Sequence, residues 1–394
     1  MGLRRFTVVF IAVSVGAGLI LAIAIDRVVG LFLLTGLIYG PHERVHYRTP
    51  EFDVVATTNS LGLRDRELGP VALGVWRLLV VGDSFTYGWG VASEETWPRV
   101  LEAELTRRGL PVEVINAGAV GGSPLTYAEV IERTVPVLRP HVVLVGVLQG
   151  DDLVQMQNAS CQTPHRRSLR RSAAQAVRAL YPNLMALARG PRPECGPREI
   201  GPVWKEQAAK IVGTFDAAER RRFEQLDAEI RGLFFRGELN PPLIEAAVRN
   251  PGWLMTGAGL NPTTGGGLVE AVAACLLRIR EAAARVKAPV IVMSVPFGAY
   301  VNARAWRARR RLGFEVDERL LNSTGPDDLI RAAAAAARLP FVTATDQFRR
   351  EVEREDLFFP LDGHLTAAGT RLYGRAIAGT LTPVLQGSHQ KTPR

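Results

Sequence analysis

The segment Trp76 to Gly90, WRLLVVGDSFTYGWG, constrains the fold of this chain more than any other. It opens with an apolar run, Leu78 to Val81, which has the length of a buried strand. The run ends at Gly82, and an acid and a hydroxyl group follow at Asp83 and Ser84. Open α/β sheets bind ligands beyond the carboxyl ends of their strands, so this serine is a candidate for chemistry. The alternative is an ordinary strand-to-helix turn in which Ser84 caps the helix.

Strand and helix patterns alternate on both sides of a long break, which is typical of a parallel α/β sheet. After the break the strand pattern resumes, and an alanine-rich helix and a closing helix follow. Besides the first strand, the expected strands are 111–115, 141–147, 289–295 and 341–344, and the expected helices are about 93–108, 126–138, 268–286, 327–338 and 366–385.

The break itself contains helical patterns, at 167–188 and 203–235, and no convincing strand. Because this break begins at the carboxyl end of the third strand, we expect the insertion at the edge of the sheet that carries Ser84, where it can cap the site. We assign no chemistry to the segment that precedes the first strand. The predicted organisation is a signal anchor at 1–27, a juxtamembrane connector at 28–75, a core at 76–160 and 288–385, a helical insertion at 161–287 and a tail at 386–394.

The N-terminal segment Phe6 to Ile25 carries no charge and is long enough to cross a bilayer as a helix. Arg4 and Arg5 precede it, and the positive-inside rule then keeps the N-terminus in the cytoplasm. The apolar stretch exceeds a signal-peptide core of about 7–15 residues, so we expect an uncleaved anchor. A cleaved signal peptide is the alternative. The prediction is a single-pass protein of a bacterial inner membrane, with its folded part in the periplasm or outside the cell.

Charge and cysteine content exclude some classes of function. The net charge is +9, with 48 basic and 39 acidic residues, and arginines crowd 166–198 and 304–311. A solvated surface explains such runs, and no nucleic-acid-binding signature accompanies them, so we expect no nucleic-acid partner. The three cysteines form no Cys-x-x-Cys pair, which argues against zinc and redox motifs. Cys161 and Cys195 are either bridged or free thiols.

A serine hydroxyl becomes a nucleophile only when a base takes its proton and a third group orients that base. His364 is the one histidine that stands between a turn and a closing helix on the expected face. Asp362, two residues earlier, is placed to hold the other ring nitrogen. A surface histidine at a helix start is the alternative. The remaining histidines are His42, His46, His141, His165 and His389.

Gly82-Asp83-Ser84, with Gly88, resembles the first block of the GDSL esterases, the SGNH hydrolase superfamily. The last block of that family is usually Asp-x-x-His, and Asp362-Gly363-His364 is one residue shorter. This shorter form is similar to the alginate-acetylating branch and its membrane-anchored relatives. The resemblance implies a flavodoxin-like three-layer sandwich with a parallel five-stranded sheet. It also implies that Ser84 is the nucleophile, His364 the base and Asp362 its orienting acid.

Acyl transfer also needs donors for the developing oxyanion. The backbone N–H of Ser84 is one candidate. The second family block resembles 116–121, which places a second donor at Gly121. The third block normally reads Gly-Asn-Asp, with the asparagine amide as donor, and here Asp151 replaces that asparagine. An ionised carboxylate cannot donate a hydrogen bond, so we consider Gln149, whose side chain carries an amide, as a substitute.

The resemblance implies a serine esterase that hydrolyses short acyl esters, such as O-acetyl groups on an envelope or secreted carbohydrate, with no metal or organic cofactor. The expected partners are the acylated carbohydrate and, through the N-terminal helix, the membrane. One alternative is O-acyl transfer to a polysaccharide by the same three residues. The other is a carbohydrate-binding or assembly module without turnover, which Asp151 motivates.

Overall fold

The computed structural model describes residues 14, 16–19, 21–25, 36–156, 197–257, 267–351 and 354–389. Its centre is a five-stranded sheet in the order β4-β3-β5-β7-β8, and every neighbouring pair is parallel. The predicted parallel five-stranded α/β sheet is therefore confirmed. The strands are β3 (Trp76–Gly82), β4 (Val112–Gly118), β5 (Val142–Leu148), β7 (Val290–Val295) and β8 (Phe341–Thr343).

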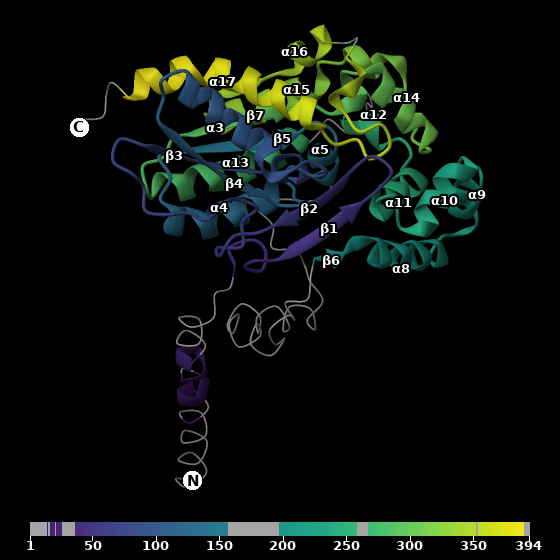
Figure 1. The fold of residues 1–394 in the computed structure, drawn as a ribbon, viewed down its shortest axis with the longest axis horizontal. Helices are drawn as coiled ribbons and strands as arrows, with labels where there is room; N and C mark the ends of the chain where they lie inside the picture. Colours follow the sequence, from purple (N-terminus) through teal and green to yellow (C-terminus); the bar gives the residue numbers. More distant parts are fainter. Residues whose placement is uncertain are drawn as a thin grey trace, which may run out of the picture.

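Helices cover both faces of the sheet, as Figure 1 shows. Side chains of a strand alternate between its faces, and here both faces are apolar because both are covered. In β3, Leu78 and Val80 belong to the core on one face, and Leu79 and Val81 to the core on the other. The first face carries α3 (Trp97–Arg107) and α17 (Ala367–His389), and the second α4 (Pro124–Leu138), α13 (Leu268–Ala284) and α15 (Gly325–Ala336).

The strand order contains a topological switch, since β4 lies on one side of β3 and β5 on the other. Ligands bind at such a switch, beyond the carboxyl ends of the strands. Short elements complete the core around this edge. They are α2 (Ser84–Tyr87), η1 (Ser93–Glu95), α5 (Asp151–Met156), η2 (Gly298–Tyr300), α14 (Ala303–Arg311), η3 (Glu318–Asn322), α16 (Thr345–Arg350) and η4 (Glu355–Leu357).

The described part of the insertion departs from the prediction in two ways. The expected helix at 203–235 is divided, because Asp216 and Asp227 each cap a new helix start. A two-residue strand, β6 (Arg198–Glu199), stands where no strand was expected. The predicted helix at 167–188 lies outside the described residues. The helices are α8 (Ile200–Gly213), α9 (Ala217–Glu224), α10 (Ala228–Arg236), α11 (Pro241–Arg249) and α12 (Trp253–Gly257).

The connector is a folded part of the molecule. Its strands β1 (Arg44–Arg48) and β2 (Asp53–Thr57) form an antiparallel hairpin, and β6 of the insertion pairs with β1 in parallel. A separate apolar cluster joins this small sheet to the core and to α8, and it includes Tyr47, Trp89 and Trp204. The connector therefore contacts the sheet edge where Ser84 lies.

The predicted anchor at 6–25 falls mostly outside the described residues, and its described part within 14–25 is helical. Among the described residues, no helix has both the length and the apolar character needed to cross a membrane. The anchor stays a prediction. Cys275 in α13 is buried and disulfide-bonded, a bond not predicted from the sequence, and Cys161 and Cys195 lie outside the described residues.

Candidate active site

Ser84 begins the short helix α2 directly after β3. Asp83 precedes it as the N-cap, and its side chain accepts a hydrogen bond from the backbone N–H of Phe85 at 2.9 Å. The turn is tight, because a Cβ on Gly118 at the end of β4 would collide with the backbone nitrogen of Tyr87. The sequence therefore holds the Ser84 hydroxyl at the carboxyl edge of the sheet, where the predicted site lies.

The structure brings Ser84, His364 and Asp362 together, although 280 positions separate the first two. His364 Nε2 lies 2.7 Å from Ser84 Oγ, and His364 Nδ1 lies 2.5 Å from Asp362 Oδ1. When the N–H at Nδ1 donates a hydrogen bond to Asp362, Nε2 carries no proton and can accept the proton of the serine hydroxyl. This geometry is that of a nucleophile, a base and an orienting acid.

The loop that carries the acid and the base is itself held in place. The N–H of Phe359 donates to the carbonyl oxygen of His364 at 2.9 Å, and the N–H of Gly363 donates to that of Phe359 at 2.8 Å. Gly363 has a φ of 93°, a conformation that favours glycine. A Cβ there would also lie 2.6 Å from a guanidinium nitrogen of Arg309. The two-residue spacing of the acid and the base is therefore built on this tight turn.

The pKa of Asp362 is lowered although its side chain is buried. Burial alone would raise its pKa, but the charge of His364 and the hydrogen bonds from that residue outweigh burial, and the pKa lies below its usual value. The indole Nε1 of Trp89 donates to Asp362 Oδ2 at 3.1 Å, so both carboxylate oxygens have donors. A carboxylate held in this way can stabilise the imidazolium that forms during proton transfer.

Aromatic rings surround the imidazole of His364. The rings of Phe85 and Trp89 lie 4.6 Å and 5.7 Å from it, measured between centroids. Trp204, from α8 of the insertion, stacks on Trp89, with ring centroids 6.1 Å apart. The insertion therefore reaches the neighbourhood of the site, on the side where it was expected.

Of the predicted oxyanion donors, some remain candidates in the structure and one does not. The N–H of Ser84 lies in the first turn of α2, where backbone amides have no partner within the helix. Gly121 lies in the turn after β4, exposed and with a φ of 69°. Because Gly82 pairs with Gly118, this turn and Ser84 leave the sheet at the same edge. Both amides remain candidate donors.

Gln149 is not an oxyanion donor, and that prediction is wrong. Its side chain is buried, and the two protons of Nε2 face three acceptors, namely Ser294 Oγ at 3.1 Å, Asp327 Oδ1 at 2.8 Å and Thr345 Oγ1 at 2.8 Å. Its Oε1 accepts from the N–H of Phe297 at 3.2 Å. The hydrogen bonds of this amide connect the carboxyl ends of β5, β7 and β8, and both amide protons are engaged by them.

Asp151 begins α5, after Gln149 and Gly150 at the end of β5, and it stands where the SGNH hydrolases that the sequence resembles have an asparagine. Burial raises its pKa, and a hydrogen bond from Gln155 and the nearby charge of His364 lower it less than burial raises it. The carboxyl group therefore keeps its proton to a higher pH than an exposed aspartate, and in that form it has an O–H to donate. Asp151 is thus a candidate donor in its neutral form.

The neighbouring Asp152 and Asp83 are buried carboxyl groups with structural partners. Asp152 accepts from the hydroxyl of Tyr127 at 2.8 Å and from the N–H of Leu148 at 2.8 Å. Burial raises the pKa of Asp152, and it raises the pKa of Asp83 to about 7. These groups fix the turns that carry Ser84 and Asp151.

The connector supplies supporting residues that were assigned no chemistry from the sequence. The hydroxyl of Tyr39 accepts from the N–H of Val120 at 2.8 Å and donates to the carbonyl oxygen of Gly118 at 3.3 Å, which fixes the turn before Gly121. The buried guanidinium of Arg64 donates to backbone carbonyl oxygens in the loop after α2, at Tyr87, Gly88 and Val91. The residues of this segment indicate only a short strand and a turn in the sequence.

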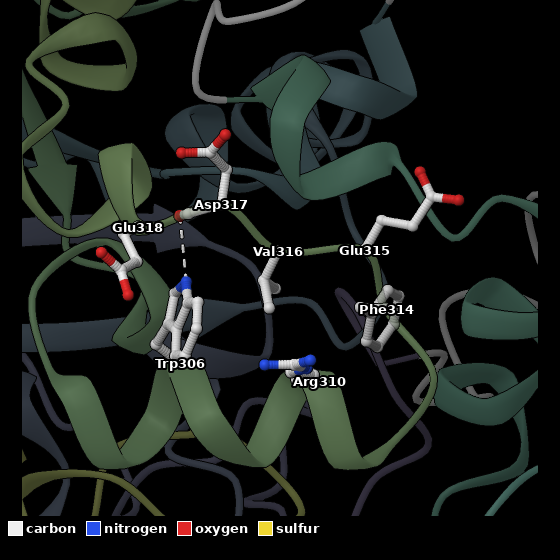
Figure 2. Close-up of a pocket in the computed structure, with 7 residues that line it drawn as sticks. All are labelled: Trp306, Arg310, Phe314, Glu315, Val316, Asp317 and Glu318. Atoms are coloured by element: carbon white, nitrogen blue, oxygen red, sulfur yellow. Dashed lines mark hydrogen bonds between the residues drawn. The ribbon is translucent and has the colours of Figure 1, made fainter.

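A surface cavity of about 640 Å³ lies beside α14, and none of the three triad residues lines it. Figure 2 shows the indole of Trp306 over this cavity, with its N–H donating to the carbonyl oxygen of Asp317 at 3.0 Å. Arg309 on the same helix donates instead to the loop before His364, so α14 separates the cavity from that loop. The lining residues are Trp306, Arg310, Phe314, Glu315, Val316, Asp317 and Glu318.

No protein-family model and no curated protein sequence matches the chain. Among solved structures it is similar to the lipase/acylhydrolase from Enterococcus faecalis, at 12% identity over 78% of this chain and 96% of that one, with a TM-score of 0.37. An acetyl xylan esterase is similar at 12% identity over 77% and 99%, with a TM-score of 0.38. A catalytic mutant of an acetylxylan esterase from Geobacillus stearothermophilus is similar at 11% identity over 77% and 92%, with a TM-score of 0.35.

The residues and distances given above define the class of this site. A Gly-Asp-Ser block follows the first strand of a parallel sheet, and a histidine before the last helix contacts that serine and an aspartate two residues upstream. The site is thus a serine–histidine–aspartate triad at the carboxyl edge of a parallel α/β sheet, an arrangement that can carry out nucleophilic acyl transfer.

Proposed function

We propose that this chain is a serine esterase of the SGNH type, with Ser84 as nucleophile, His364 as base and Asp362 as orienting acid. The observation that carries the proposal is the 2.7 Å contact between His364 Nε2 and Ser84 Oγ, with Nδ1 of the same ring on Asp362. The distance is within the range that proton transfer to a general base requires.

The reaction follows from this geometry. Ser84 Oγ attacks the acyl carbonyl carbon while His364 Nε2 takes the hydroxyl proton, and a tetrahedral intermediate with an oxyanion forms. The N–H groups of Ser84 and Gly121 and the neutral carboxyl group of Asp151 are the proposed donors to that oxyanion. His364 then returns the proton to the leaving alcohol oxygen as the ester bond breaks. Water repeats the sequence on the acyl-serine and releases the carboxylic acid.

The proposed substrates are short acyl esters, such as O-acetyl groups on an envelope or secreted carbohydrate. The two-residue spacing of Asp362 and His364 supports this choice, since it resembles the alginate-acetylating branch. The proposed location is a bacterial inner membrane, with the site in the periplasm or outside the cell. The uncharged segment Phe6 to Ile25 behind two arginines supports that location.

Transfer of the acyl group to a sugar hydroxyl uses the same three residues and differs only in the acceptor. A binding module without turnover is the other alternative, and the aspartate at position 151 motivates it, because in its ionised form the carboxylate would repel the oxyanion.

Ester turnover by the full chain in detergent tests the proposal. We expect hydrolysis of an aryl acetate and of an O-acetylated polysaccharide by the wild type, and a loss of about 10³-fold or more in kcat for Ser84→Ala. Equal rates in the two proteins would remove Ser84 from the mechanism. An acetyl group that appears on an added glycan, in place of free acetate in solution, would favour acyl transfer to a sugar over hydrolysis.

A further inference from the structure

The connector hairpin reaches the loop that carries the acid and the base. Glu51 lies in the turn between β1 and β2, next to Phe52. Its Oε1 accepts from the N–H of Leu361 at 2.7 Å, and its Oε2 accepts from the N–H of Asp362 at 2.7 Å. One carboxylate therefore binds two consecutive amides of the loop, and one of those amides belongs to the residue that orients His364.

The same loop is held from the opposite side. The buried guanidinium of Arg309 donates to the carbonyl oxygen of Leu361 at 2.5 Å and to that of Pro360 at 3.3 Å. Glu51 thus binds the amides of the loop, and α14 binds its carbonyl oxygens through Arg309. Such paired contacts fix the rotation of the peptide planes at Leu361 and Asp362.

The turn that carries Glu51 has its own support. Thr49 Oγ1 accepts from the N–H groups of Glu51 and Phe52, each at 3.1 Å. The ring of Phe52 packs on Phe359 at the start of the loop, with centroids 5.0 Å apart. Gly90 permits this approach, because a Cβ there would lie 2.7 Å from the ring of Phe359. The turn is therefore anchored to the loop by an apolar contact that does not depend on the carboxylate.

The pKa of Glu51 is raised above its ordinary value. Burial raises the pKa of Glu51, its two backbone hydrogen bonds and the charge of Arg309 lower it, and the charge of Asp362 raises it. Arg309 is the cation that faces both carboxylates. A carboxyl group therefore stands at a partly buried position beside Asp362, and the two amides of the loop are the groups that it binds.

We propose that Glu51 is a positioning residue for the reaction: by binding the amides of Leu361 and Asp362, it holds Asp362 where it orients His364 toward Ser84. The juxtamembrane connector is then part of the catalytic unit. This inference rests on the proposed esterase function. Displacement of a catalytic group by about 1 Å can cost on the order of 10²-fold in rate, so a small shift of this loop is sufficient.

The test compares Glu51→Gln and Glu51→Ala with the wild type as full chains. Glutamine keeps one acceptor oxygen and places an NH₂ group against the second amide, whereas alanine removes both acceptors. We expect kcat to fall about tenfold for Glu51→Gln and up to about a hundredfold for Glu51→Ala, with KM within about twofold of the wild type. Asp53→Asn is the matched control, since Asp53 lies in the same hairpin and its ion pairs are exposed. It should retain the wild-type kcat.

Hydrogen exchange supplies a readout that does not depend on turnover. We expect faster amide exchange in the peptide that covers 358–366 in both Glu51 variants, and unchanged exchange there in Asp53→Asn. Wild-type kcat and wild-type exchange in Glu51→Ala would overturn the inference. A wild type without esterase activity would contradict the proposed function, and the exchange data would still decide whether Glu51 holds the loop. If Glu51→Ala fails to fold, Glu51→Gln carries the same comparison.

Discussion

Asp151→Asn isolates the most unusual feature of this site, an aspartate where the SGNH hydrolases that the sequence resembles have an asparagine amide. Burial raises the pKa of Asp151, so the neutral acid persists to a higher pH than usual and can donate to the oxyanion. Above that pKa, the neutral fraction falls about tenfold for each pH unit, which corresponds to about 1.36 kcal/mol. An asparagine amide donates at every pH. It also keeps an oxygen for Gln155, whose Nε2 lies 3.0 Å from Asp151 Oδ2.

The ratio of kcat between Asp151→Asn and the wild type should therefore be near one at low pH. It should rise about tenfold per pH unit above the pKa of Asp151. The rise should stop at about 10²–10³-fold, the usual effect of one oxyanion donor. The assay is hydrolysis of an uncharged acetyl ester across this pH range, with Asp151→Ala as a control that lacks a donor at every pH. A pH-independent ratio, or an Asp151→Ala variant as fast as the wild type, would refute the role of Asp151.

Two further substitutions test neighbouring contacts. Trp89→Phe keeps a ring beside His364 but removes the hydrogen-bond donor to Asp362 Oδ2. A hydrogen bond to a charged group is worth about 1.5–3 kcal/mol, so kcat should fall about tenfold or more. Unchanged steady-state kinetics would contradict this expectation. Gln149→Leu removes a buried amide that bonds Ser294, Asp327, Thr345 and the N–H of Phe297, and it should lower the free energy of unfolding in urea by about 2–3 kcal/mol. We expect kcat per folded molecule to be retained, and a loss of kcat of about 10²-fold would return Gln149 to the oxyanion hole.

The core of the fold could be predicted from the sequence because its signals are local. Apolar runs that end in Gly82 and Gly150 mark the strands, and short motifs mark Ser84 and His364. Each of these signals lies within a few residues, and parallel strands then bring the motifs to one edge. Local patterns and one topological rule bring these motifs to one edge of the sheet, and the resemblance to the SGNH hydrolases implied which residues form the triad.

The supporting residues could not be predicted, because their role depends on contacts between distant parts of the chain. Glu51 binds amides 310 and 311 positions away, and its own neighbourhood indicates only a turn. Gln149 carries the expected chemistry near the expected edge, but its side chain turns toward Ser294, Asp327 and Thr345. Asp216, by contrast, is followed by glutamate three residues later, a capping box that marks the divided helix in the sequence itself.

The central claim is that His364 activates the hydroxyl of Ser84 across 2.7 Å. Labelling of the full chain with a serine-directed fluorophosphonate, followed by peptide mass analysis, tests it most directly. We predict one adduct on the peptide that contains Ser84, no adduct in Ser84→Ala, and labelling at least about 10²-fold slower in His364→Ala. A wild type without an adduct, or equally rapid labelling in His364→Ala, would contradict the account.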